Sequence, residues 1–126
     1  MKIKQNDPPR AYTVGINTVI QLKDCAHIEL AADEQITLKT ESGAEYDVTR
    51  KSWGFYATPS LNGRLKSFGM RAALVKSPTQ RYYVLLLEKG KETEFNNYLK
   101  QEDQSIVCWL DDDNAFSSLE EKLNAK

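Results

Sequence analysis

Apolar and polar residues alternate with a period of two in short runs through the first two thirds of the chain. The clearest runs are HIEL at residues 27–30, QITLK at 35–39 and AEYDVT at 44–49. Successive side chains of a β-strand point to opposite faces of the sheet, so this pattern is typical of strands with one face in water. Strands and turns that recur about every 8–12 residues predict an antiparallel β-sandwich or a partly open barrel over residues 11–88.

Glycine, proline and short polar residues separate these runs. Residues 15–17, 24–26 and 31–34 are predicted breaks or turns between the first strands. Residues 40–43 end in Gly43, which accepts the positive φ of a tight turn, so they are predicted to join the two neighbouring runs as a hairpin. Residues 76–80 are predicted to be a second hairpin loop.

A turn is predicted over residues 58–63, and a strand is predicted after it. Alternate apolar positions in this strand share one face: Phe68, Met70, Ala72 and Leu74. Arg71 then points to the opposite face, unless Gly69 marks a β-bulge that shifts the register.

The next run, YYVLLLE at residues 82–88, is apolar at both alternating sets of positions. Strands that are buried on both faces have this composition. The run is therefore predicted to lie in the centre of a sheet, with a helix or a second sheet covering each side.

After Gly90 the apolar period changes from two to three and four residues. Residues 91–101 predict a helix with Phe95, Tyr98 and Leu99 on one stripe, and residues 105–110 predict a further buried strand. A final helix is predicted to start at Asp113 or Asn114 as its N-cap. The expected fold class is therefore α+β: the β-rich part, then helix, strand and helix.

The length of 126 residues fits one domain that can bury a core without metals or disulfides. Residues 1–10 have no apolar periodicity and contain Pro8 and Pro9, so they are predicted to be a flexible N-terminal arm. Residues 11–126 are predicted to be a single β-rich domain with two C-terminal helices. An alternative architecture is one curved sheet with both helices on one face.

Cysteine usage and hydropathy favour a reduced, cytoplasmic protein. Cys25 and Cys108 lie far apart, with no CxxC spacing and no secretory leader before them. The longest apolar run, at residues 82–87, is far too short for a membrane-spanning helix, so no contact with a membrane is predicted.

The distribution of charge singles out one stretch. Residues 48–87 contain no Asp or Glu although the chain has 18, while 7 of the 17 Lys and Arg residues fall there: Arg50, Lys51, Arg64, Lys66, Arg71, Lys76 and Arg81. If these strands are adjacent, their surface carries a positive potential that favours an anionic partner. The alternative is that acids of other strands lie opposite these side chains as ordinary cross-strand pairs.

Aromatic, amide and guanidinium groups gather in the same stretch, and they define the candidate ligand-binding residues: Trp53, Tyr56, Asn62, Arg64 and Arg71. Aromatic faces stack on sugar rings or bases, asparagine orients a ligand, and arginine holds phosphate or carboxylate with two hydrogen bonds. The leading hypothesis is non-catalytic binding of an anionic or carbohydrate-containing small molecule, such as a sugar nucleotide. Alternatively, Trp53 and Phe55 are core residues at a strand end, and residues 58–63 are only a turn.

Catalytic and metal motifs are weak. Cys25 and His27 are two apart on a strand and point to the same face, where a thiolate–imidazole pair is conceivable, but a nucleophilic cysteine also needs a positive environment. One histidine and two distant cysteines do not supply a structural zinc site. The chain has no glycine-rich phosphate motif, and its pI near 5.9 disfavours nucleic acid as a partner. No catalytic residue, metal or cofactor is predicted.

The run WGFYATPSLNGRL followed by FGMRAALV resembles short uncharacterised bacterial proteins encoded among genes for cell-surface polysaccharide. The resemblance covers residues 11 to about 113. It carries no catalytic residue or cofactor, and it implies sugars or sugar nucleotides as the ligand class.

Two further hypotheses stay open. The aromatic and basic stretch suits a homodimer or partner interface, because contact centres are rich in Trp, Tyr and Arg. The third hypothesis is a small isomerase or epimerase with Tyr46, Tyr56 or His27 as acid or base, although the sequence alone does not place an acid and a base within reach of each other.

Overall fold

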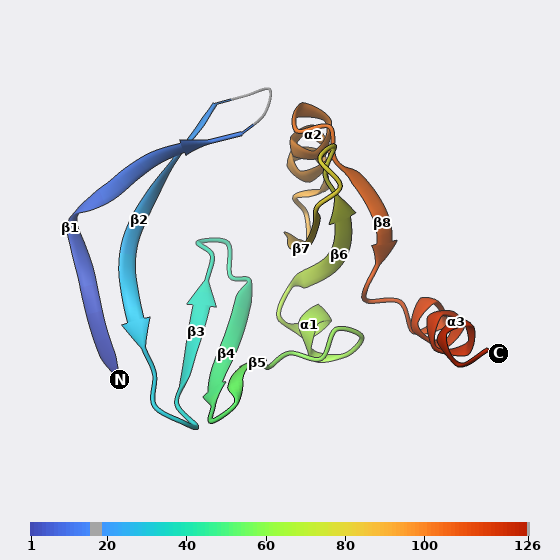
Figure 1. Cartoon of the computed structure of the whole chain (residues 1–126), viewed down its shortest axis with the longest axis horizontal. Coiled ribbons are helices and arrows are strands. Elements are labelled where there is room, and N and C mark those ends of the chain that lie inside the picture. Colours follow the sequence, from blue (N-terminus) through green and yellow to red (C-terminus); the bar gives the residue numbers. More distant parts are fainter. Residues whose placement is uncertain (16–18, 126) are drawn as a thin grey trace. The chain divides into compact units, whose positions relative to one another are not determined.

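The computed structural model describes residues 1–15 and 19–125, and it confirms the α+β class (Figure 1). In the described residues the strands form three antiparallel sheets, with the orders β1-β2, β3-β4-β5 and β7-β6-β8. The elements in chain order are β1 (Lys2–Val14), β2 (Ile20–Glu29), β3 (Gln35–Lys39), β4 (Glu45–Lys51), β5 (Gly54–Ala57), α1 (Arg64–Ser67), β6 (Met70–Lys76), β7 (Tyr82–Glu88), α2 (Glu92–Gln101), β8 (Ser105–Trp109) and α3 (Asp113–Asn124).

The chain folds into two compact units, where the sequence predicted one domain. The first unit comprises Met1–Thr37 and Asp47–Thr58, and the second comprises Leu38–Tyr46 and Pro59–Lys126. The boundaries between the units lie within β3, after Thr37, and within β4, after Tyr46. The turn of the β3–β4 hairpin therefore belongs to the second unit, and the far ends of both strands belong to the first.

The first unit contains a long antiparallel ribbon of β1 and β2. Apolar cross-strand pairs such as Ile3↔Ile28 and Tyr12↔Leu22 alternate with polar pairs such as Lys2↔Glu29. Residues 2–10, which the sequence predicted as a loose arm, are therefore part of a paired strand. The predicted break at residues 24–26 lies inside β2, and Ile16 and Asn17 of the predicted turn at 15–17 lie outside the described residues.

The register of the ribbon is irregular between Gln5 and Arg10 of β1. This segment contains Pro8 and Pro9, with a cis peptide bond between Asp7 and Pro8. Proline has no N–H to donate to a neighbouring strand, so it is tolerated in a strand at a bulge or along an edge. The irregular register between Gln5 and Arg10 therefore accommodates both prolines within β1.

The three-stranded sheet β3-β4-β5 begins with the predicted turn at residues 31–34. The N–H of Ala31 donates to Oε1 of Glu34 at 2.7 Å in this turn. The predicted hairpin at 40–43 is confirmed, since the N–H of Thr40 donates to the Ala44 carbonyl at 3.0 Å and Gly43 has φ +102°. A two-residue loop then joins β4 to β5, whose register runs from Val48↔Ala57 to Lys51↔Gly54.

The sheet of the second unit has β6 in its centre, and the prediction that residues 82–88 form the central strand is wrong. β7 pairs only with β6 among the described strands and forms one outer edge, while β8 forms the other. Within β7, Tyr82 and Val84 are 56% and 57% exposed. The apolar run therefore does not reflect burial on both faces.

Buried residues lie on both faces of this sheet. One cluster is formed by Ala44, Leu65, Met70 and Ala72, and the other by Ala73, Val75 and Leu99 of α2. Of the predicted apolar face, Met70 and Ala72 are buried, while Phe68 precedes the strand. Ala73 and Val75 form a second buried face behind it. Side chains of α2, including Phe95 and Tyr98, pack against the second cluster.

The short helix α1 was not predicted. Residues 64–68 were expected to enter the next strand, but the N–H of Phe68 donates to the Arg64 carbonyl at 3.1 Å and Leu65 becomes fully buried. Gly69, with φ +79°, ends this turn directly before β6. The glycine therefore marks the end of a helix, where the left-handed conformation is common, and not a bulge in the strand.

The last two helices agree with the apolar periodicity. α2 covers the predicted range within one residue, and α3 starts after Asp112, whose carboxylate accepts from the N–H of Asn114 at 2.8 Å. The N-cap is therefore one residue earlier than the expected Asp113 or Asn114. In the second unit, the hairpin loop predicted at residues 76–80 joins β6 to β7 as expected.

Candidate functional site

The tip of the β4–β5 hairpin in the first unit presents two large aromatic side chains to solvent. Trp53 is 72% exposed in the loop, and Phe55 is 65% exposed on β5. The alternative interpretation of these two residues as part of a core is therefore wrong. We call Trp53, Phe55 and Arg50 the aromatic tip.

Arg50 belongs to the aromatic tip because the β4–β5 register pairs it with Phe55. Residues opposite each other in an antiparallel pair project from the same face, so the Arg50 and Phe55 side chains leave the sheet on one face. The Arg50 backbone is fixed from its other side: its N–H donates to the Glu34 carbonyl at 2.9 Å, and its carbonyl accepts from the Asp33 N–H at 2.7 Å. The backbone of Arg50 is therefore held by two neighbouring segments, residues 33–34 and β5.

The two basic residues of β4 differ in their pairing. Nζ of Lys51 lies 2.6 Å from Oδ1 of Asp33, which neutralises the lysine. No carboxylate of residues 1–15 or 19–125 lies within ion-pair distance of Arg50. The positive charge beside the exposed rings is therefore that of Arg50.

Tyr56 does not join Trp53 in the way the sequence suggested. It pairs with Thr49, so its side chain leaves β5 on the face opposite to that of Phe55. Tyr56 is 51% exposed. Phe55, which was not a predicted site residue, is therefore the aromatic residue that shares a face with Arg50.

The three other predicted residues, Asn62, Arg64 and Arg71, belong to the second unit. Arg71 is engaged: its Nε donates to Oδ2 of Asp111 at 2.8 Å, and its guanidinium lies 3.9 Å from the ring centroid of Trp109. The Asp111 side chain is 3% exposed. The hydrogen bond to Asp111 raises the pKa of Arg71, which stays charged and is neutralised by a buried partner.

Asn62 and Arg64 also have partners in the second unit. Nδ2 of Asn62 donates to Oδ1 of Asp113 at 2.8 Å, and the Arg64 guanidinium lies 5.0 Å from the Phe68 ring centroid. Beside them is an open groove of about 560 Å³, lined by Lys66, Arg71, Asp111, Asp112, Asp113 and Asn114. Three carboxylates and two cations line it, so the groove does not have the net positive character expected for an anion site.

The acid-free stretch is therefore partly neutralised by acids from elsewhere in the chain, as the alternative interpretation proposed. Asp33 pairs with Lys51 in the first unit, and Asp111 pairs with Arg71 in the second. These ion pairs could not be predicted from the local sequence, because the acids are 18 and 40 residues from their partners. The Asp run at 111–113 is the sequence signal for the second pair.

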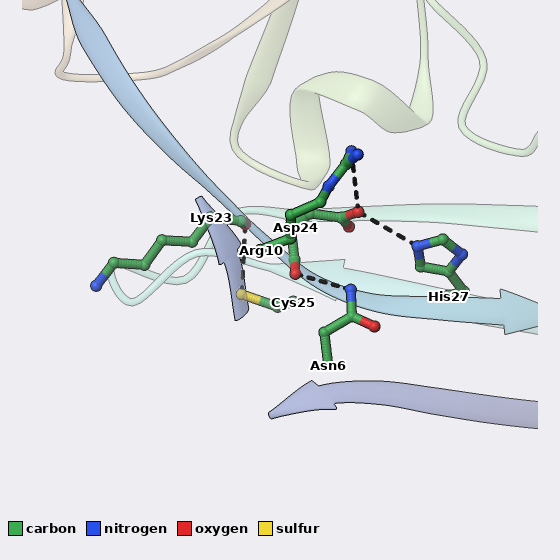
Figure 2. A network of polar contacts seen from close by, with 6 residues as sticks. All are labelled: Asn6, Arg10, Lys23, Asp24, Cys25 and His27. Atoms are coloured by element: carbon green, nitrogen blue, oxygen red, sulfur yellow. Dashed lines mark hydrogen bonds and ion pairs between the residues drawn. The ribbon is translucent and has the colours of Figure 1, made fainter. Parts of the chain in front are cut away.

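Cys25 and His27 do not form a pair in the ribbon (Figure 2). Nε2 of His27 lies 3.2 Å from Oδ2 of Asp24, and the Cys25 thiol donates to the Lys23 carbonyl at 3.5 Å. Asp24 also lies 3.5 Å from the Arg10 guanidinium. The cluster therefore centres on a carboxylate that connects the two strands, and the thiolate–imidazole arrangement is not present.

The three residues considered as an acid or base are divided between the two units. Tyr46 packs against the first core cluster of the second unit, while His27 and Tyr56 belong to the first unit. No group of three or more metal-binding side chains occurs among the described residues. Within the same residues, no helix has both the length and the apolar character required to cross a membrane.

The comparisons with known proteins give no relatives: no protein-family model, curated protein or solved structure matches this chain. The aromatic tip is the candidate functional site. Its Arg50 was noted in the charge pattern but was not among the predicted site residues. The structure identifies it, because a two-residue loop at Ser52 and Trp53 places Arg50 opposite Phe55.

Proposed function

We propose that the protein binds, without catalysis, an anionic carbohydrate-containing small molecule such as a sugar nucleotide or an acidic sugar at the aromatic tip. The observation that carries the proposal is the exposure of Trp53 and Phe55 beside Arg50. Large aromatic rings in water are costly, and a sugar ring that stacks on them removes apolar area from water. Arg50 offers the paired donors that a phosphate or carboxylate group accepts.

Charge and rigidity support the anionic character of the ligand. Arg50 has no ion-pair partner among the described residues, whereas Lys51 next to it is neutralised by Asp33. Its backbone is held by β5 on one side and by residues 33–34 on the other. A side chain on a fixed backbone loses less backbone freedom on binding, which favours affinity. The resemblance to proteins encoded among polysaccharide genes points to the same ligand class.

The test is a thermal-shift panel of nucleotides, sugar nucleotides, acidic sugars and neutral sugars with wild type, Trp53→Ala and Arg50→Ala. A ligand present at about 100 times its dissociation constant adds roughly 2.7 kcal/mol, which raises the midpoint by several degrees. We expect a shift with an anionic sugar compound that both substitutions abolish. Arg81→Ala is the matched control, because Arg81 is an exposed arginine of the second unit.

Tryptophan fluorescence gives an independent readout. The two tryptophans differ in environment, since Trp53 is exposed and Trp109 lies under the Arg71 guanidinium. In Trp109→Phe protein the signal comes from Trp53, and the ligand should change it in a saturable manner. If the thermal shift survives Trp53→Ala but is lost in Arg71→Lys, the ligand binds at the groove of the second unit and the proposal for the aromatic tip is wrong.

A second candidate function is an interaction module, and the β1–β2 ribbon favours it. Ile3 and Ile28 form a cross-strand pair, yet they are 60% and 41% exposed. Two-stranded ribbons alone are marginally stable in water, and a partner surface of apolar character would stabilise this one. Ile3→Lys, with Lys4→Ala on the neighbouring polar position as its control, distinguishes this function: only the former should abolish association with a protein partner.

A further inference from the structure

The outer edge of β7 is unusually regular. All seven residues of β7 pair with β6 in one unbroken register, from Met70↔Glu88 to Lys76↔Tyr82. On its other side, β7 has no strand neighbour among the described residues. The outward N–H and C=O groups of β7 are thus available to a further strand.

The composition of β7 does nothing to prevent such pairing. Residues 82–87 read YYVLLL, without proline and without charge, and the first charged residue is Glu88. Natural proteins usually protect an edge with charged side chains, prolines, bulges or short strands. None of these devices occurs in β7 before Glu88.

Other strands of the same chain carry such devices. β8, the opposite edge of the sheet, has five residues, and its register with β6 shifts between Leu74 and Val75 so that Val107 is left out of the pairing. β1 contains two prolines and its own register shift. The lack of protection on β7 therefore differs from how this chain treats its other edges.

Side-chain exposure is concentrated at the first half of β7. Tyr82, Tyr83 and Val84 are 56%, 45% and 57% exposed. Leu85 and Leu86 are half-buried, and Leu87 is buried. The exposed part of the strand therefore runs from Tyr82 to Val84, away from the end where Glu88 accepts hydrogen bonds from Ser42 and Thr40.

We propose that β7 pairs with β7 of a second copy of this chain, antiparallel and across a two-fold axis at Val84. This register places Val84 opposite Val84 of the other copy, Tyr83 opposite Leu85 and Tyr82 opposite Leu86. Every opposed pair is apolar or aromatic, which is the favourable kind of cross-strand pair. A register centred one residue later would place Tyr82 opposite Glu88 and bury a carboxylate against a ring.

A second copy is the occupant that this strand fits best. A two-fold contact uses the same surface twice, so the strand must complement its own sequence, and residues 82–86 do so without any charge. Pairing would also place the unprotected edge of β7 inside a larger sheet. The continuous six-stranded sheet would have the order β8-β6-β7-β7-β6-β8, and both of its outer edges would be the short, irregular β8.

The primary test is the mass in solution, measured by sedimentation equilibrium over a wide range of concentration. We expect the wild type to reach twice the 14.4 kDa mass of one chain. Val84→Lys places two like charges opposite each other across the axis and should raise the dissociation constant of the dimer roughly 100-fold. Because Val84 is mostly exposed, the variant should keep the wild-type circular dichroism spectrum.

Val107→Lys is the matched control. Val107 is the same residue type with similar exposure, 50%, but it lies on the opposite edge of the same sheet. The control should dimerise like the wild type. If Val107→Lys weakens the dimer as much as Val84→Lys does, the contact does not use the β7 edge and the proposal is wrong.

Charge exchange tests the register. A 1:1 mixture of Val84→Lys and Val84→Glu proteins should form heterodimers, although each variant alone is monomeric, because opposite charges then face each other at the axis. A mixture that stays monomeric would overturn pairing at Val84. A wild type that is monomeric at all concentrations would overturn self-pairing altogether.

The outcome is independent of the proposed ligand site. The tested residues lie on β7 and β8 of the second unit, whereas the aromatic tip belongs to the first. Val84→Lys protein should therefore retain its thermal shift with an anionic sugar compound. Hydrogen exchange adds a readout: amides of residues 82–86 should exchange more slowly as the protein concentration rises.

Discussion

Arg71 donates from Nε to Oδ2 of Asp111 at 2.8 Å, and the aspartate is almost completely buried while the arginine is about one third exposed. The arginine also covers the Trp109 ring at 3.9 Å. The two contacts connect β6 to Trp109 at the end of β8 and to Asp111 just after it. We interpret Arg71 as a structural residue.

Removal of Arg71 should therefore destabilise the protein. Arg71→Ala leaves the Asp111 carboxylate buried without its partner, and we expect a loss of about 2–3 kcal/mol in the free energy of unfolding. Arg71→Lys keeps the charge but loses the planar group that stacks on Trp109 and donates two hydrogen bonds to Asp111. We expect it to lower the free energy of unfolding by about 1 kcal/mol. Urea denaturation measures both.

Arg81→Ala is the control for this pair, because Arg81 is exposed in the loop before β7. Its free energy of unfolding should change by less than about 0.5 kcal/mol. An Arg71→Ala protein with the wild-type denaturation midpoint would show that Asp111 finds another partner and that Arg71 is free for ligand binding.

The Glu88 carboxylate makes stability depend on pH. The hydroxyl of Ser42 donates to it at 2.6 Å and that of Thr40 at 3.0 Å, and these hydrogen bonds lower the pKa of Glu88 below its usual value of 4.5. A lowered pKa in the folded state means that the stabilisation is present above about pH 4.5 and is lost as the pH falls through the folded pKa. Ser42→Ala should raise the pKa of Glu88 and be less stable than wild type at neutral pH.

NMR titration of the Glu88 carboxyl carbon measures this pKa directly, and denaturation at pH 7 and at about pH 3 measures the linked stability. The difference between wild type and Ser42→Ala should vanish at the lower pH. Ser118→Ala, an exposed serine of α3, is the control and should leave both quantities unchanged. An unchanged pKa of Glu88 in Ser42→Ala would contradict the assignment.

Sequence periodicity predicted the individual helices and strands of this fold better than the order of the strands in the sheets. The hairpin at 40–43 and the helix α2 follow from local signals, turn glycine and a three- and four-residue apolar repeat, which act within a few residues. The order of strands depends on contacts between distant segments. Tyr82 to Leu87 is apolar enough for a central strand, but β8 occupies the other side of β6 and leaves β7 at the edge.

The candidate site also depends on contacts between distant segments, which local sequence signals do not reveal. Exposure of Trp53 and Phe55 cannot be derived from their apolar character, which is equally typical of a core. The neutralisation of Arg71 depends on an aspartate 40 residues later in the sequence. The pairing of Arg50 with Phe55 follows from the two-residue hairpin loop, which fixes which residues lie opposite each other.

Leu65 should be the most sensitive position of α1. Its side chain is fully buried with Ala44, Met70 and Ala72, although the helix has only four residues. Leu65→Ala should cost about 2–5 kcal/mol, since it removes buried apolar atoms and leaves a cavity. Leu123→Ala, at a position that is 76% exposed, should change the free energy of unfolding by less than about 0.5 kcal/mol. Equal effects of both substitutions in thermal denaturation would mean that α1 is not part of the core.

Asp24 should hold the irregular part of the ribbon together. The side chain of Asn6 donates to the Asp24 carbonyl at 2.9 Å, and the Asp24 carboxylate lies near Arg10 and His27 (Figure 2). These contacts bridge the strands where the regular register of β1 is interrupted. Asp24→Ala removes the carboxylate, and Asn6→Ala removes the bond to the backbone.

Hydrogen exchange distinguishes this local role from a global one. Amides of β1 and β2 should exchange faster in both variants, while amides of β6 in the second unit keep their wild-type rates, because local opening does not require unfolding of the other elements. Glu29→Ala at the end of the ribbon, whose carboxylate is 75% exposed beside Lys2, is the control and should have little effect. Faster exchange in β6 as well would mean that the ribbon and the second unit unfold together.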